Sequence, residues 1–187
     1  MTQFKEAVED SPIIAAVKDM EGLERCLKSD SRIIFILFGD VLTIADIVAR
    51  VKQSNRMAMV HLDLIGGLTT KEISVDYIKN ATRADGIITT KPALIKRAKE
   101  LRLYTILRFF AIDSMAYDNI HRQCQSARPD CIEILPGVMP KVIARIVRQE
   151  HAPVIAGGLI ADKEDIMAAL DAGAVSVSTT NATLWFL

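Results

Sequence analysis

The sequence lacks the features that mark secreted, membrane-spanning or metal-binding proteins. Its three cysteines, Cys26, Cys124 and Cys131, form no CxxC pair and have no histidine cluster nearby. This pattern favours free thiols in a reducing compartment. No apolar run reaches the roughly 18 residues that cross a bilayer, and the first residues are polar and acidic, unlike a signal peptide. We therefore expect a cytoplasmic protein with no metal and no membrane contact.

An excess of charge is also missing. The chain has 187 residues with 23 basic and 23 acidic side chains, so its formal net charge is +0. A nucleic-acid surface would therefore have to be a local patch of cations. Half of the residues are hydrophobic (50%), enough for one sizeable core but too few residues for two ordinary domains. We expect a single compact domain over residues 1–187.

Familiar catalytic and nucleotide-binding motifs are absent. The sequence contains no HExxH, no nucleophile elbow and no Gly-rich nucleotide loop, and the first turn reads VKDMEG where a dinucleotide fingerprint would stand. Any catalytic role would rest on isolated polar residues, and we expect no cofactor.

What the chain does contain is a regular alternation of short apolar runs and amphipathic stretches. The runs predict eight strands, at 13–17, 33–39, 57–65, 86–90, 104–111, 131–135, 153–159 and 174–180. Segments of helical spacing lie between them, with start signals at Asp113-Ser114, Pro140 and Asp162 and a start near Val75. Alternation of this kind predicts a parallel sheet, and eight repeats close into a TIM-type (β/α)8 barrel of the α/β class.

Polar residues stand at the carboxyl ends of the predicted strands, where barrels of this type carry their functional groups. They are Lys18, His61, Asp63, Lys91, Arg108 and Glu133. His61 and Asp63 are two apart and are expected on one strand face. Ion pairs that close the barrel mouth are an equally good interpretation for Arg108, Glu133 and His61, because charges near a core are rarely left unpaired.

The end of the chain predicts a phosphate site. The seventh predicted strand runs into Gly157 and Gly158, and the eighth into Ser178 and Thr179, followed by the short stretch ATLWFL. Glycines let the backbone approach an anion, while hydroxyls and the N–H groups opening a short last helix would supply donors. The loop that contains Gly66 and Gly67 could close over a ligand, although a plain surface loop explains it as well.

Several segments resemble the glycerol uptake operon antiterminator family, regulatory proteins that respond to glycerol 3-phosphate. They are SPIIAAVKD (11–19), HLDLIGGL (61–68), DGIITTK (85–91), CIEILPGVMPK (131–141), APVIAGGLI (152–160) and VSTTN (177–181). The resemblance implies a barrel that binds glycerol 3-phosphate as effector and then acts on leader mRNA of glycerol-metabolism genes to prevent termination. It also implies that Gly157, Gly158, Ser178 and Thr179 bind the phosphate, with Lys18, Asp63, Lys91 and Glu133 near the glycerol end.

No motif marks an RNA surface, so charge must guide the search. Two predicted helices carry clustered cations: Lys96, Arg97, Lys99 and Arg102 in one, and Lys141, Arg145 and Arg148 in the other. For either set, an ordinary solvent-exposed helix face explains the cations as well as an RNA-binding surface does. A homo-oligomer would double the charge offered to RNA, and we expect one on this ground.

The alternative function is a small phosphosugar isomerase, aldolase or synthase that uses the same phosphate-binding site. Lys91 would then act as amine or acid, and Asp63 or Glu133 as base. A catalytic group needs a partner that tunes its pKa, and the sequence identifies none. We therefore favour a ligand sensor that is not an enzyme.

Overall fold

The computed structural model describes residues 3–187 as a closed barrel of eight parallel strands in sequence order. The strands are β1 (Ile13–Val17), β2 (Ile33–Ile36), β3 (Met57–His61), β4 (Gly86–Thr89), β5 (Tyr104–Phe110), β6 (Cys131–Leu135), β7 (Val154–Gly157) and β8 (Ser176–Thr179). The TIM-type barrel predicted from the alternation is confirmed. Most strands end earlier than the apolar runs suggest, because the last residues of each run lead into the loops at the barrel mouth.

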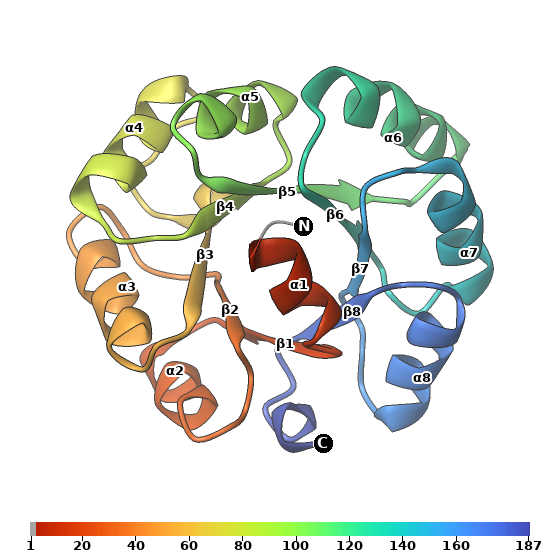
Figure 1. Cartoon of the computed structure of the whole chain (residues 1–187), viewed down its shortest axis with the longest axis horizontal. Coiled ribbons are helices and arrows are strands. Elements are labelled where there is room, and N and C mark those ends of the chain that lie inside the picture. Colours follow the sequence, from red (N-terminus) through yellow and green to blue (C-terminus); the bar gives the residue numbers. More distant parts are fainter. Residues whose placement is uncertain (1–2) are drawn as a thin grey trace.

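Helices cover the outside of the barrel (Figure 1). They are α2 (Met20–Cys26), α3 (Ile44–Gln53), α4 (Glu72–Ala81), α5 (Pro92–Glu100), α6 (Ser114–Ala127), α7 (Pro140–Gln149) and α8 (Lys163–Asp171). The start signals are confirmed: Asp113 and Asp162 accept backbone N–H bonds as N-caps, and Pro140 begins α7. The helix expected near Val75 begins earlier, at Glu72.

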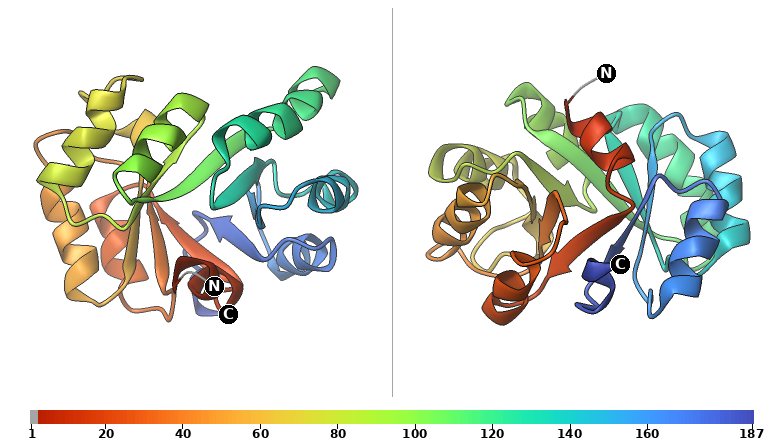
Figure 2. Two further views of the ribbon diagram at one scale, coloured as in Figure 1. Left: turned by 45° about the horizontal axis from the view of Figure 1, so that its top comes forward. Right: turned by 60° about the horizontal axis from the view of Figure 1, so that its bottom comes forward.

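The segment after β8 differs from the expected short last helix. It forms a single 3-10 turn, η2 (Leu184–Phe186), beside β1 and α2 (Figure 2). The buried indole of Trp185 donates from Nε1 to the Thr179 carbonyl at 2.9 Å. Packing of this one aromatic side chain therefore closes the outer wall where an eighth outer helix would stand.

An additional helix, α1 (Gln3–Glu9), lies across the amino-terminal opening of the barrel (Figure 1). Phe4 and Val8 are fully buried in the barrel interior, and the Phe4 ring stacks on Tyr104 with ring centroids 4.8 Å apart. Sequence analysis missed this helix because Phe4, Ala7 and Val8 are the only apolar residues of this short polar segment. The barrel is therefore plugged at this end, and the mouth faces away from the reader in Figure 1.

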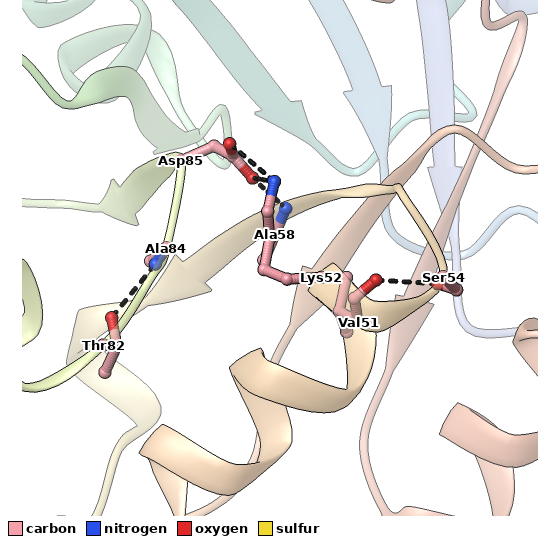
Figure 3. A network of polar contacts seen from close by, with 7 residues as sticks. All are labelled: Val51, Lys52, Ser54, Ala58, Thr82, Ala84 and Asp85. Atoms are coloured by element: carbon pink, nitrogen blue, oxygen red, sulfur yellow. Dashed lines mark hydrogen bonds and ion pairs between the residues drawn. The ribbon is translucent and has the colours of Figure 1, made fainter.

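A polar network ties α3 to the strands at the same end (Figure 3). Lys52 Nζ lies 2.6 Å from Asp85 Oδ2, and the same oxygen accepts the Ala58 N–H at 2.7 Å. Asp85 thus holds the start of β3 and the outer helix together, which is the stabilising role usual for this face of the fold.

The interior of the barrel is apolar from the plug upward and becomes polar at the mouth. Inward-facing side chains of the lower layers, including Ile14, Met59, Ile106 and Ile155, pack with Phe4 and Val8 in one buried cluster. The next inward positions toward the carboxyl ends are His61, Arg108, Glu133 and Ser178, all of them buried. The three cysteines are free, as expected, and all three are buried. Among residues 3–187, none of the helices is long and apolar enough to cross a membrane.

Candidate functional site

One layer of the barrel carries the polar floor of the mouth. Following the strand pairing around the barrel, with the usual stagger of about one residue per strand, places Ala16, His61, Arg108 and Gly157 at one height. Two of these side chains are long and polar, and the other two positions have little or no side chain. The layer is therefore open on the side of β1 and β7 and polar on the side of β3 and β5.

A buried ion pair orients the arginine of this layer. Arg108 Nε donates to Glu133 Oε2 at 2.6 Å, and Ser178 Oγ donates to Glu133 Oε1 at 2.5 Å. Arg108 and Glu133 are 8% and 0% exposed. The expectation of an ion pair at the barrel mouth is confirmed for these two residues. The Nη atoms of Arg108 make no hydrogen bond within residues 3–187, so their N–H groups remain available to a ligand.

Gly157 has a packing reason to be glycine. A Cβ at this position would lie 2.5 Å from Ser178 Oγ and 2.6 Å from Glu133 Oε1. Any side chain would therefore push the Arg108–Glu133 pair out of place. Gly157, which was predicted to let a phosphate approach, is needed as glycine to leave space for the Glu133 carboxylate.

A cavity of about 360 Å³ opens above this layer. It is lined by Ala16, Leu37, Arg108, Glu133, Leu135, Gly158, Leu159, Ile160, Ser178, Thr179, Thr180 and Asn181. All four residues predicted to bind phosphate lie at or beside this cavity, on the ends of β7 and β8. The hydrogen bonds that these residues already make determine which of their polar atoms remain available to a ligand.

The side-chain hydroxyls at this end already have partners, whereas several backbone N–H groups do not. Ser178 donates to Glu133, and Thr179 Oγ1 donates to the Ile160 carbonyl at 3.2 Å. The hydrogen bonds of the described residues leave the N–H groups of Gly158, Leu159 and Thr180 unused. Gly158 and Leu159 both have positive φ (77° and 62°), which turns successive peptides of this loop out of the strand direction. Backbone N–H groups in such loops bind anions.

His61 has no hydrogen-bond partner among residues 3–187. Neither ring nitrogen makes a hydrogen bond within the described chain, and the residue is 2% exposed. Burial and the neighbouring Arg108 charge lower its pKa to about 4, outweighing the opposite effect of Asp63. The imidazole is therefore neutral near pH 7, with one N–H donor and one acceptor nitrogen.

Asp63 does not share a strand face with His61, so that expectation is wrong. β3 ends at His61, and Leu62–Leu64 form a 3-10 turn. The Asp63 carboxylate accepts from Thr89 Oγ1 at 2.7 Å and from Thr90 N and Oγ1, both at 2.8 Å. Burial opposes its charged form, but these hydrogen bonds prevail and hold the pKa of Asp63 below its usual value. Both oxygens of its carboxylate thus accept hydrogen bonds from residues at the end of β4.

The two lysines predicted near the glycerol end lie on the rim. Lys91 is exposed at the start of α5 and does not line the cavity. Lys18 is also exposed and lines a separate hollow of about 130 Å³, which shares Ala16 and Thr180 with the cavity. Of the four glycerol-end predictions, the structure brings only Glu133 into the cavity wall and places Lys18 next to it.

The glycines of the loop after β3 anchor that loop. Gly66 N donates to the Gly39 carbonyl and Val41 N donates to the Gly66 carbonyl, both at 2.9 Å. Gly67 has φ +85° and packs against Val41. This segment is therefore pinned to the loop after β2, which supports the interpretation as an ordinary surface loop.

The two cationic helices differ in how their charges are compensated. On α5, Arg97 pairs with Asp76 and Glu100, and Lys99 donates to the Arg128 carbonyl. On α7, the cations Lys141, Arg145 and Arg148 are exposed and form no ion pair within residues 3–187. Their spacing places them along one face of α7, which contains no acidic residue. α7 therefore carries the less compensated positive charge.

Two larger hollows lie away from the mouth. One of about 600 Å³ is lined by residues of α6, Glu150 and the amino-terminal ends of β6 and β7, and one of about 580 Å³ lies between α2 and α3. Neither has the buried, preoriented cation that the mouth cavity has. The mouth is therefore the candidate ligand site.

Sequence analysis noticed Arg108 and His61 but did not assign them to a ligand. The missing signal was their height in the barrel, because both continue the inward series of Ile106 and Met59 beyond the apolar layers. Strand alternation together with the barrel stagger would have placed them in one layer with Gly157.

Fold and site together define a class: a (β/α)8 barrel whose mouth carries a fixed guanidinium and unused backbone N–H donors. Residues 13–185 match the family model described as glycerol-3-phosphate responsive antiterminator. The chain belongs to this family, as the sequence segments suggested.

Individual relatives agree with this assignment. The chain is 42% identical over 180 residues to the uncharacterized protein YgcP of Escherichia coli, covering 96% of this chain and 94% of the relative. A glycerol uptake operon antiterminator regulatory protein from Listeria monocytogenes is 34% identical with TM-score 0.89, covering 92% and 94% of the two chains. A related protein from Thermotoga maritima is 32% identical with TM-score 0.83, covering 94% and 98%. The chain thus matches its relatives over nearly their whole length.

Proposed function

We propose that this protein is a glycerol 3-phosphate sensor that, with ligand bound, acts on leader mRNA of glycerol-metabolism genes to prevent termination. The observation that carries the ligand part is the mouth cavity, which is lined by Arg108, Gly158, Leu159 and Thr180, whose Nη or backbone N–H groups have no partner within residues 3–187. A phosphate group accepts many hydrogen bonds and favours charge-assisted ones. Family membership supplies the antitermination part.

The pairing of the mouth charges favours a sensor over an enzyme. Arg108 and Glu133 neutralise each other, and Ser178 occupies the second carboxylate oxygen. Asp63 is held by the end of β4, and Lys91 stands outside the cavity. Such groups bind and orient a ligand, whereas a general acid or base needs a group free to exchange protons with substrate. A phosphosugar enzyme remains the second candidate because an N-acetylmannosamine-6-phosphate 2-epimerase from Clostridium perfringens, 14% identical, shares the fold with TM-score 0.74.

RNA is proposed to contact α7, because its cations are not offset by acidic neighbours on the same helix. α7 follows β6 directly, and β6 carries Glu133. A ligand that tightens the Arg108–Glu133 pair would therefore act on the strand and loop that lead into α7. A homo-oligomer would present more than one such face to RNA.

The test is calorimetric titration of the purified chain with glycerol 3-phosphate, with glycerol and inorganic phosphate as controls. We expect glycerol 3-phosphate to bind more tightly than either control and to be recovered unchanged. Chemical conversion of the ligand would favour the enzyme instead, and failure to bind it would refute the sensor.

A further inference from the structure

His61 is the one polar side chain of this layer that makes no hydrogen bond at all within residues 3–187. Both ring nitrogens are buried and unpaired within residues 3–187. A buried polar group without a partner costs roughly 1 to 3 kcal/mol, so it is rarely retained without a role. An apolar residue would complete the floor at lower cost, as Met59 and Ile88 do in the layers beneath.

The position of His61 in the layer shows which residues it faces across the barrel interior. The layer order around the barrel is Ala16, His61, Arg108 and Gly157, so His61 stands across the interior from Gly157 and next to Arg108. The free backbone N–H groups lie just above Gly157, on the loops after β7 and β8. His61 lies in the floor beside Arg108 but is not among the residues that line the cavity, and both of its ring nitrogens are buried, so a ligand anchored on these loops reaches the ring only by displacing the atoms that cover it.

The protonation state of His61 defines the chemistry it can recognise. Because its pKa is about 4, the ring is neutral near pH 7 and offers one donor and one acceptor. A hydroxyl group is the complementary partner, since it also donates one hydrogen bond and accepts others. A second anionic group would be a poor match, since a neutral imidazole has one donor and its acceptor nitrogen would repel that group.

We infer that His61 recognises a hydroxyl on the carbon chain of a phosphorylated polyol and thereby sets the specificity of the mouth for polyol phosphates over simple phosphates. This inference rests on the proposed function, since it takes the phosphate to dock on the loops after β7 and β8. His61 is a specificity-determining residue in this arrangement, and Arg108 and the backbone N–H groups supply the affinity that all phosphate esters share.

The experiment compares the wild-type chain with His61→Leu and His61→Gln. Each is titrated with glycerol 3-phosphate and with n-propyl phosphate, which has the same carbon skeleton and phosphate but no hydroxyl. We expect His61→Leu to bind glycerol 3-phosphate about tenfold more weakly and propyl phosphate with unchanged affinity. His61→Gln keeps a donor and an acceptor and is expected to recover part of the preference.

Thermal unfolding of the variants controls for the fold. His61→Leu removes two unpaired buried nitrogens and should unfold at the wild-type temperature or above it. If His61→Leu keeps the wild-type preference for glycerol 3-phosphate, or weakens both ligands equally, the inference is overturned while the proposed function stands. If the wild-type chain binds neither phosphate ester, the proposed function fails and the inference with it.

Discussion

At the scale of single residues, the mouth is organised around a guanidinium that the protein has already oriented. Glu133 fixes Arg108 through Nε, and Ser178 and the missing side chain of Gly157 fix Glu133 in turn. The cost of burying the two charges is offset by their pairing, and the ligand meets donors that need not reorganise. In the proposed function, each of these three residues therefore acts on the ligand through Arg108.

Replacing Arg108 by lysine tests this arrangement. Lysine keeps a positive charge beside Glu133 but lacks the planar fork whose Nη groups reach the cavity. We expect Arg108→Lys to weaken glycerol 3-phosphate binding by about ten- to a hundredfold, measured by calorimetry. The control is Arg97→Lys on α5, a paired arginine outside the mouth, which should bind as wild type. Wild-type affinity in Arg108→Lys would show that the ligand does not use this guanidinium.

Protonation of His61 should make the protein sensitive to mild acid. Its pKa is about 4 in the folded chain and 6.5 as a free group, so the unfolded chain binds the extra proton first. Stability is therefore fully present above about pH 6.5 and is lost as pH falls toward 4, by up to about 3 kcal/mol. Urea unfolding at several pH values should show this loss in the wild type and a flatter profile in His61→Leu. Identical profiles would contradict the assigned pKa.

At the scale of elements, α7 and α5 differ in a way that composition alone does not reveal. Both carry clustered cations, but acidic neighbours Asp76 and Glu100 hold Arg97 on α5, whereas the cations of α7 stand free along one face. Affinity for nucleic acid depends on phosphates neutralised by available cations. The two helices are therefore distinguished by whether acidic side chains pair with their cations, and not by the number of cations.

The prediction is that Lys141→Glu, Arg145→Glu and Arg148→Glu together weaken leader RNA binding by at least about tenfold and reduce its salt dependence. Glycerol 3-phosphate binding should be unchanged, because none of these residues lines the mouth cavity. Lys96→Glu with Arg102→Glu, which reverses two exposed cations on α5 and just after its end, is the control. A larger loss in this control than in the α7 variant, measured by filter binding or anisotropy, would place the RNA elsewhere.

The amino-terminal end of the barrel is expected to serve stability alone. Asp85 joins Lys52 and the Ala58 N–H, with both charged side chains about four-fifths buried. Asp85→Ala should lower the free energy of unfolding by about 2 to 3 kcal/mol in urea, because it leaves the lysine and the amide without a partner. Ligand affinity at a temperature where the variant is folded should match the wild type, and a large loss of affinity would show that this end communicates with the mouth.

At the scale of the whole molecule, the barrel was predictable because its order is local. Eight apolar runs alternate with amphipathic segments, and a parallel sheet follows from this alternation without knowledge of any contact. The plug α1 was not predictable, since Phe4 and Val8 form a face only once a barrel stands beneath them. The sequence also favoured a last helix, which the packing of Trp185 replaces by a single turn.

The site was predictable in place but not in detail. The ends of β7 and β8 were identified from Gly157, Gly158, Ser178 and Thr179; the last three line the cavity, and Gly157 adjoins Gly158. Which atoms are free depends on hydrogen bonds between distant segments, such as Thr179 to the Ile160 carbonyl. Asp63 was misplaced because β3 ends two residues before it, and strand ends are set by loop geometry that no periodicity encodes.

The central claim is that ligand and RNA are coupled through one barrel. We would measure glycerol 3-phosphate binding by calorimetry in the absence and in the presence of saturating leader RNA. A coupling of about 1 to 3 kcal/mol requires RNA to tighten ligand binding roughly 5- to 150-fold, since the effect is reciprocal. Tighter binding within that range, with the ligand recovered intact, is the result we predict, and an affinity that RNA leaves unchanged would contradict the account.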